Sequence, residues 1–160
     1  MPNKIQYGEN KWVYLKDTRF IHIYLIVDGK THELFGFTNN DAIKWTKVDN
    51  DFDLDSDFSG DPIMLQNHSS KGQITLSCNE NGQAAAYGEA VIKRQKTYAL
   101  GEIPTVGLKV VNDNNNKTVD LPYAFAQKEP DGGITNSFDN SEYTFLGWNF
   151  DVDQDSGIVL

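Results

Sequence analysis

Residues 20–37 of the chain read FIHIYLIVDGKTHELFGF, and this stretch decides the fold class. Two runs rich in β-branched and aromatic residues flank the pair Asp28-Gly29. An Asp-Gly pair between two such runs is typical of a β-hairpin closed by a type I′ turn. In that register Leu25 faces His32 on the partner strand. The sequence therefore predicts an antiparallel hairpin here.

The rest of the chain carries further strand signals and one helix signal. The helix is expected over about residues 82–98, where alanines cluster and apolar residues recur at helical spacing. Gly88 interrupts this segment and weakens a helix by about 1 kcal/mol relative to Ala. Pro122 indicates a sheet edge or a bulge. Strands are predicted at 11–15, 43–48, 73–78, 105–111, 118–127 and 142–150. This order predicts a mainly β fold, an antiparallel β-sandwich or barrel with one flanking α-helix.

Length and composition limit the classes of protein that the chain could belong to. The chain has 160 residues, the size of one domain, and 39% of them are apolar, which suffices for a core. No apolar run is long enough for a membrane-spanning helix, and the first residues, MPNKIQYGENKW, lack the apolar stretch of a signal peptide. The single cysteine excludes an internal disulfide. We therefore expect synthesis in the cytoplasm and no membrane partner.

Negative charge is concentrated in two short stretches. The net charge is −9, and residues 41–61 and 139–160 each contribute −5, whereas residues 1–40 sum to +1 and 62–138 to zero. This balance argues against a surface that grips nucleic-acid phosphates and against an anionic membrane as partner. An account of function has to assign a role to these two stretches.

The first acidic stretch has an unusual period. Aspartates occupy every second position from Asp49 to Asp57, with Phe52, Leu54 and Phe58 between or after them. An extended chain would place the carboxylates on one face and the apolar groups on the other. Because Asp is a poor strand former, the later half is predicted to be a loop.

Known catalytic and metal-binding patterns are not matched. A calcium loop of the type D-x-[DN]-x-[DN]-G needs Gly at its sixth position, where this chain has Leu54 or Ser56. His22 and His32 lie on opposite arms of the predicted hairpin without facing each other. No nucleophile motif and no phosphate-binding glycine loop is present. We therefore expect no enzyme, no metal site and no cofactor.

The order of segments resembles a known family. Residues 35–76 run FGFTNNDAIKWTKVDNDFDLDSDFSGDPIMLQNHSSKGQITL, residues 124–131 AFAQKEPD and residues 142–150 EYTFLGWNF. This layout resembles the tail tube proteins of contractile-tailed bacteriophages. The resemblance covers the domain at residues 20–152, and leaves residues 1–19 as an N-terminal arm and 153–160 as a C-terminal tail.

The resemblance implies a structural virion protein. Six copies would close into a ring, their strands would pool into one large barrel, and stacked rings would form a tail tube through which DNA is ejected without specific binding. Its partners would be other copies of itself, the tail sheath, the baseplate or initiator, and the terminator. The protein would be made in the host cytoplasm and reside in the virion tail. A calcium-dependent β-sandwich binding module, for carbohydrate or protein, is the alternative.

Two sets of residues acquire hypothetical roles from the resemblance. The carboxylates of Asp49, Asp51 and Asp53 would face the lumen or its rim and repel DNA; alternatively, they only solvate the outer surface. The long connection from about Asp53 to Lys71 would reach the neighbouring ring. Its anchors would then be the four apolar residues Phe58, Ile63, Met64 and Leu65. Alternatively, this connection is a loop packed on its own core.

Overall fold

The computed structural model describes residues 4–14, 16–38, 42–98, 103–133, 140–155 and 157–160. Within these ranges the chain forms twelve β-strands, one α-helix and a short 3-10 helix. The predicted mainly β class with a single helix is confirmed. The polar residues 38–41 (TNND), for which the sequence predicts a turn, fall mostly outside the described residues.

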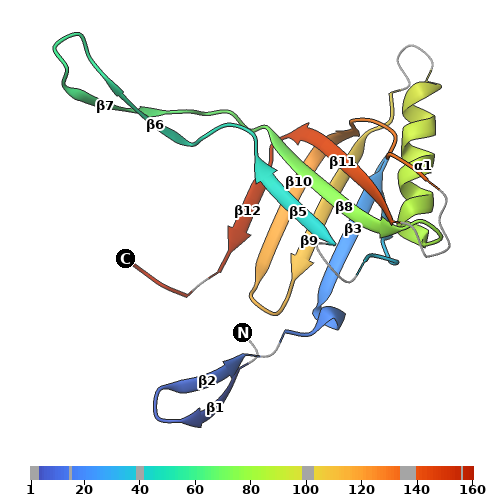
Figure 1. Cartoon of the computed structure of the whole chain (residues 1–160), viewed down its shortest axis with the longest axis horizontal. Coiled ribbons are helices and arrows are strands. Elements are labelled where there is room, and N and C mark those ends of the chain that lie inside the picture. The colour runs from blue at the N-terminus through green and yellow to red at the C-terminus, as the bar shows by residue number, and fades with distance from the viewer. Residues whose placement is uncertain (1–3, 15, 39–41, 99–102, 134–139, 156) are drawn as a thin grey trace.

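One antiparallel sheet forms the body of the molecule (Figure 1). Every neighbouring pair in the sheet is antiparallel. Its strands follow the order β4 (Lys30–Glu33), β3 (Ile21–Val27), β9 (Val106–Asn112), β10 (Lys117–Ala126), β11 (Asn140–Trp148), β8 (Gly72–Asn79) and β5 (Ile43–Lys47), and β12 (Asp151–Gln154) also pairs with β10.

The predicted hairpin is present as β3 and β4. Asp28 and Gly29 both have positive φ, +49° and +81°, as a type I′ turn requires. Leu25 pairs with His32, which confirms the predicted register. β4 ends at Glu33, earlier than expected, because the chain then crosses to the opposite side of the sheet.

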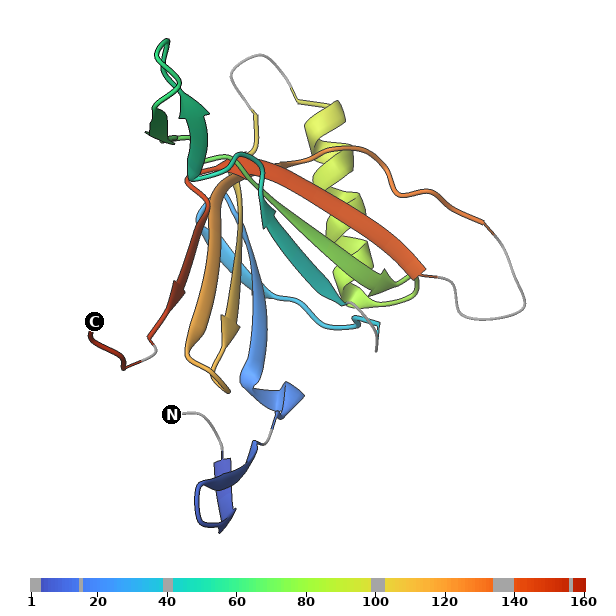
Figure 2. The same ribbon diagram turned by 60° about the vertical axis from the view of Figure 1, so that its left-hand side comes forward.

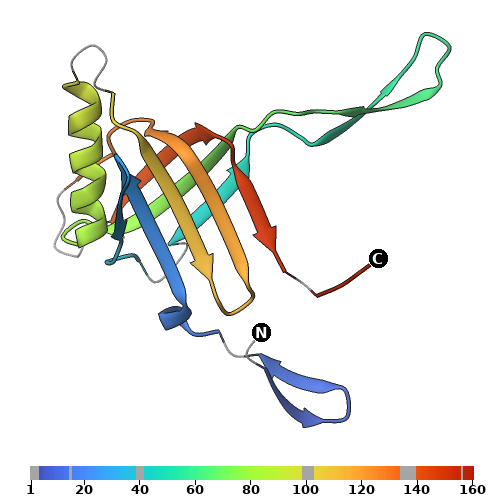
Figure 3. The ribbon, with the colours of Figure 1, turned by 180° about the vertical axis from the view of Figure 1, so that it is seen from behind.

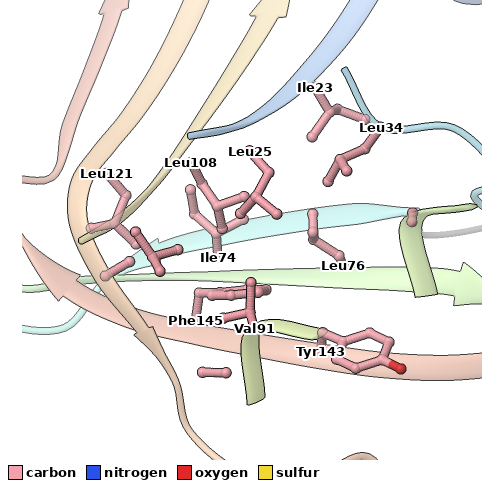
Figure 4. Close-up of a cluster of buried hydrophobic side chains, with 14 of the residues drawn as sticks. Ile23, Leu25, Leu34, Ile74, Leu76, Val91, Leu108, Leu121, Tyr143 and Phe145 are labelled. Atoms are coloured by element: carbon pink, nitrogen blue, oxygen red, sulfur yellow. The ribbon is translucent and has the colours of Figure 1, made fainter. Parts of the chain in front are cut away.

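The sheet curls into an open barrel around its core. After β4 the chain forms an isolated bridge from Phe37 to Cys78 on β8, which links the two sides of the sheet at one end. Figure 2 shows β3, β9 and β10 on one side and β5, β8 and β11 on the other. Side chains from both sides fill the interior (Figure 4), among them Ile23, Leu25, Ile74, Leu76, Leu108, Leu121, Tyr143 and Phe145.

Helix α1 (Gln83–Lys96) packs on this core through its buried face. Its first residue, Gln83, accepts a hydrogen bond from Phe35 N at 2.8 Å and donates to Glu33 O at 3.0 Å. Near its other end, Gln95 makes the same two-way pairing with the backbone of Ala126. Two side-chain amides therefore fasten the helix to the ends of β4 and β10.

The predicted effect of Pro122 is confirmed as a bulge. The pairing of β10 with β9 shifts register between Leu121 and Ala124, and β10 is an interior strand of the sheet. On its other side β10 pairs first with β12 and then with β11 in one common register. β11 and β12 thus follow β10 as a single strand interrupted at Asn149.

Two hairpins lie outside the main sheet, at opposite ends of the body (Figures 1 and 3). The N-terminal hairpin consists of β1 (Lys4–Gly8) and β2 (Lys11–Tyr14) and is followed by the 3-10 helix Thr18–Phe20. The acidic hairpin consists of β6 (Phe52–Ser56) and β7 (Pro62–Gln66). Each is a two-stranded sheet of its own.

Candidate functional site

The acidic hairpin projects from the body as an independent element (Figure 2). β6 pairs with β7 from Phe52 opposite Gln66 to Ser56 opposite Pro62. The loop predicted for the later half of residues 49–61 is therefore wrong at Asp55 and Ser56, which belong to β6, and is confirmed at residues 57–61 between the two strands. Pairing with β7 satisfies backbone groups of a segment whose aspartates alone disfavour a strand, because strand preference depends on cross-strand context.

The tip of the hairpin is organised by one aspartate. The Asp57 carboxylate accepts hydrogen bonds from Ser59 N at 2.8 Å and from Asp61 N at 2.9 Å. The backbone N–H of Asp57 donates to Asp61 O at 2.8 Å. Gly60 supplies a φ of +84°, which side chains other than glycine adopt rarely. The tip is thus an ordered turn held by its own hydrogen bonds.

The two faces of the acidic hairpin differ in chemistry. Residues opposite each other in an antiparallel pair share a face, so Leu54 lies beside Met64 and next to Phe52 on one apolar face. On the other face Asp53 pairs with Leu65, and Asp55 pairs with Ile63. The expected segregation of carboxylates and apolar groups therefore holds within β6, while β7 adds apolar groups to both faces.

The structure places the four expected anchor residues on the surface. Phe58 at the tip is completely exposed, and Ile63, Met64 and Leu65 lie on β7 with 39%, 72% and 48% of their surface exposed. The alternative that this segment packs on the core of its own chain is wrong. The hairpin presents apolar groups that nothing within the described chain covers.

The three aspartates assigned to the lumen or rim lie at and above the base of the hairpin. The Asp49 carboxylate accepts a hydrogen bond from Ser69 Oγ at 2.5 Å, and Asp53 accepts one from Asn50 Nδ2 at 3.1 Å. The carboxylate of Asp51 forms an ion pair with Lys47. Asp49 is partly buried, whereas Asp51 and Asp53 are exposed. The structure thus brings the three carboxylates into one segment, each with a local polar partner.

The base of the hairpin is fastened to the main sheet through Ser70. Its carbonyl accepts a hydrogen bond from Phe150 N at 3.0 Å, and its hydroxyl accepts one from Asn149 N at 3.2 Å. Phe150 in turn packs over Gly72, where a Cβ would lie 2.2 Å from its ring. The base of the hairpin is therefore tied to the main sheet at the strand interruption between β11 and β12.

The histidines and the cysteine considered as possible site residues either have a partner nearby or are buried. His22 Nδ1 lies 2.8 Å from Glu33 Oε1, and His32 Nδ1 lies 3.3 Å from the Tyr87 hydroxyl, so the two histidines do not meet. Cys78 is fully buried, and burial raises the pKa of its thiol to about 12.

Among the described residues there is no group of three or more acidic, histidine or cysteine side chains that could hold a metal ion. None of the described helices has the length and apolarity to span a membrane.

Sequence reasoning missed the exposed apolar face of the N-terminal hairpin. Ile5 pairs with Val13, and Tyr7 lies on the same face; all three are more than half exposed. The available signal is the alternation in KIQYG before Asn10, which takes a positive φ of +56° at the turn. Without a third strand, so short a run was assigned to a polar arm.

A second missed feature is an aromatic groove on the body. The rings of Tyr123 and Trp148 stack at 5.6 Å between centroids, and both are half exposed. They border a cavity of about 390 Å³, also lined by Ile103 and Phe125. The bulge at Pro122 turns Tyr123 to the outer face, which a strict alternation would not predict.

Comparison with known proteins identifies structures but no sequence relatives. No protein-family model and no curated protein matches the sequence. The cap that terminates the tube of the anti-feeding prophage is similar with a TM-score of 0.58 at 17% identity, over 92% of this chain and 97% of the cap chain. A chain from the sheath/tube terminator of the extracellular contractile injection system PVC gives 0.53 at 13% identity, over 82% of this chain and 92% of that one.

A third similar structure is a chain of the native gene transfer agent virion, with a TM-score of 0.53 at 12% identity, over 89% of this chain and 100% of that one. Identities this low show the fold alone. The three matches cover 82–92% of this chain and 92–100% of the matched chains. The resemblance to tail tube proteins is thereby confirmed at the level of the fold: this chain has the fold of tube and tube-terminator components of contractile injection systems.

Proposed function

We propose that this chain is a structural component of a tail or injection tube, and that it assembles into stacked rings. The shared fold supports a structural rather than an enzymatic role. The observation that carries the proposal is the acidic hairpin, whose apolar face of Phe52, Leu54 and Met64 lies outside the core. An exposed apolar surface of this kind is typical of a protein interaction site.

A tube lumen would have to form between copies. The interior of this open barrel is filled by side chains, as expected for about eight strands, whereas a channel needs about 16 or more. Several copies would pool their strands around a common axis. Head-to-tail interfaces that close by rotation give such a ring, and we propose six copies.

In this proposal the acidic residues keep DNA from adhering to the lumen. A duplex carries one negative charge per about 1.7 Å, so a basic wall would bind it through counterion release. Six copies at −9 each would carry −54. Asp49, Asp51 and Asp53, grouped at the base of the hairpin, would line the lumen or its rim, and DNA would slide past without specific binding.

The remaining partners follow from the same proposal. A tube would contact a surrounding sheath along its length, a baseplate or initiator at one end and a terminator at the other. The protein would reside in the virion tail after synthesis in the host cytoplasm.

A tube-terminating cap is the second candidate function. The supporting observation is the anti-feeding prophage cap, which is similar over 92% of this chain and 97% of its own. A tube protein would polymerise to any length, whereas a cap would form single rings that bind tube ends.

Negative-stain electron microscopy of the purified chain over a concentration series tests the proposal and separates the two candidates. Hollow tubes support the tube protein and isolated rings support the cap. The variant Leu54→Asp/Met64→Asp, or deletion of residues 55–65, should leave folded chains that no longer stack. Phe35→Asp, at an exposed apolar position outside both hairpins and the aromatic groove, is the matched control and should assemble normally. Normal stacking of the hairpin variants would contradict the proposal.

The lumen role has its own test. Reversing Asp49, Asp51 and Asp53 to Lys should slow DNA ejection from assembled particles while tubes still form, because the reversed charges attract phosphates. Reversal of Asp113, Asp131 and Asp155, three exposed acidic residues elsewhere, controls for the change in net charge. Unchanged ejection kinetics in the first variant would refute the role.

A further inference from the structure

We infer that the acidic hairpin of one copy docks onto the N-terminal hairpin of the next copy. The inference rests on the proposed function and names the surface that receives the acidic hairpin. It follows from three properties of the two hairpins: each has an unpartnered apolar face, they carry opposite net charge, and they lie at opposite ends of the molecule.

The N-terminal hairpin needs a partner to be stable. Within the described part of the chain it pairs with no strand of the main sheet, and the face formed by Ile5, Tyr7 and Val13 is exposed. An isolated two-stranded hairpin is at best marginally stable in water, and a third strand or a packing surface is needed to order it. The acidic hairpin has the same need and offers the apolar face of Leu54 and Met64.

The chain just after the N-terminal hairpin is fastened to the body at Asp17. Asn114, only 7% exposed, donates from Nδ2 to Asp17 O at 2.9 Å and accepts from Asp17 N at 3.0 Å. The Asp17 carboxylate caps the following 3-10 helix by accepting from Arg19 N, and the hydrogen bond from the Arg19 side chain lowers the pKa of Asp17. The segment that follows the hairpin is thus held on the body by several hydrogen bonds.

The two hairpins are complementary in charge. Residues 48–66 contain six aspartates and no basic residue, a net charge of −6. Residues 1–19 contain four basic and two acidic residues, a net charge of +2. The exposed Lys11 and Lys16 lie on and just after β2. Complementary charge favours this pairing and disfavours contact between two copies of the same hairpin.

The positions of the two hairpins allow the contact to repeat from copy to copy along a stack. The two hairpins lie at opposite ends of the body in three views (Figures 1, 2 and 3), so a chain cannot join its own pair. Contact between different surfaces of successive copies is heterologous, and without rotational closure it repeats indefinitely. Each copy would use one hairpin toward the copy above and the other toward the copy below, as a stack of rings requires.

Cysteine cross-linking tests the contact in the full chain. One population carries a single cysteine at Phe52, Leu54 or Met64, and the other carries one at Ile5, Tyr7 or Val13. At least one mixed pair should form a disulfide, which needs Cα atoms within about 7 Å, and neither population should do so alone. Chains with a cysteine in both hairpins should give a ladder of oligomers. The native Cys78 is fully buried, and Asp131→Cys is an exposed control that should not cross-link.

Charge exchange provides a second, independent readout. Lys11→Glu/Lys16→Glu alone, or Asp55→Lys/Asp61→Lys alone, should weaken stacking about tenfold or more, because like charges then meet. The four substitutions together should restore stacking to within about threefold, as a coupled pair of sites does. Circular dichroism and thermal unfolding confirm that each variant is folded.

The outcomes separate this inference from the proposed function. Tubes with no cross-link in any mixed pair, and no rescue by the fourfold variant, would overturn the receiving surface and leave the proposed function intact. Cross-links within one population alone would show a like-with-like contact and also overturn it. A chain that forms neither rings nor tubes nor mixed disulfides at any concentration would overturn both.

Discussion

At the residue scale, Gly88 shows how a packing contact can outweigh helix propensity. A Cβ at this position would lie 2.7 Å from Cδ1 and Cε1 of the buried Tyr143 ring, whose hydroxyl donates to Glu89. The higher helix propensity of alanine should stabilise a Gly88→Ala chain by about 1 kcal/mol. Overpacking the core should destabilise it by about 1–3 kcal/mol. We expect a net loss of stability in denaturant unfolding.

The exposed Ala90 on the same helix provides the control for Gly88. Ala90→Gly should cost only the propensity term, about 1 kcal/mol. A Gly88→Ala chain more stable than the parent would show that the Tyr143 ring yields to the added methyl group.

Cys78 gives a prediction for alkaline pH. Burial raises the pKa of its thiol from 9.0 to about 12, so between these values the unfolded chain is deprotonated and the folded chain is not. The thiol's contribution to stability is therefore complete below pH 9 and is lost at about 1.4 kcal/mol per pH unit as the pH rises toward 12. Denaturant titrations should show a steeper alkaline decline for the parent than for Cys78→Ala. Equal slopes would contradict the prediction.

At the element scale, substitutions at two turn glycines test whether the acidic hairpin contributes to the stability of the body. Gly29 and Gly60 have nearly the same φ, +81° and +84°, and open space around them, so alanine is equally strained at either site. Placing a residue other than glycine in the left-handed backbone conformation costs about 1–2 kcal/mol of folding free energy. Gly29→Ala should lower Tm by about 2–4 °C per kcal/mol, because β3 and β4 belong to the main sheet.

Gly60→Ala should leave Tm unchanged and weaken stacking instead, because the acidic hairpin contributes nothing to the core. Differential scanning calorimetry of the two variants, followed by sedimentation, makes the comparison. Equal losses of Tm would mean that the acidic hairpin unfolds together with the body.

How far the sequence predicts this structure depends on how local each element is. The register of the hairpin at Asp28-Gly29 depends on a turn of two residues and was predicted correctly, as were the helix and the bulge at Pro122. The placement of β3 beside β9 joins residues far apart in the chain, and no local pattern encodes it.

The candidate site was predicted only in part for the same reason. The period of the aspartates indicated an extended segment with two faces, but Asp propensity argued for a loop in its later half. Pairing with Pro62–Gln66 overrides that propensity in β6. The exposure of Phe58, Met64 and Leu65 depends on how the base is tied at Ser70, which the sequence does not reveal.

At the scale of the whole molecule, calcium distinguishes a tube component from a calcium-dependent binding module. The described carboxylates form no group of three or more that could hold a metal ion. We expect thermal unfolding in millimolar calcium to match that in chelator. A ligand present at 100 times its Kd would stabilise the chain by about 2.7 kcal/mol, so a marked rise of Tm would favour the binding module.

The attachment of the acidic hairpin also determines how the molecule would carry a mechanical load. Both legs of the hairpin run into the neighbouring strands β5 and β8, so a pull on its tip draws these two strands together in one direction. The resistance then comes from β8 against β11, which pair in continuous register from Gly72–Gly147 to Asn79–Asn140. Such a ladder is loaded in shear, with its hydrogen bonds strained all at once instead of being unzipped one after another. A pull on the hairpin would therefore be resisted by the whole ladder between β8 and β11.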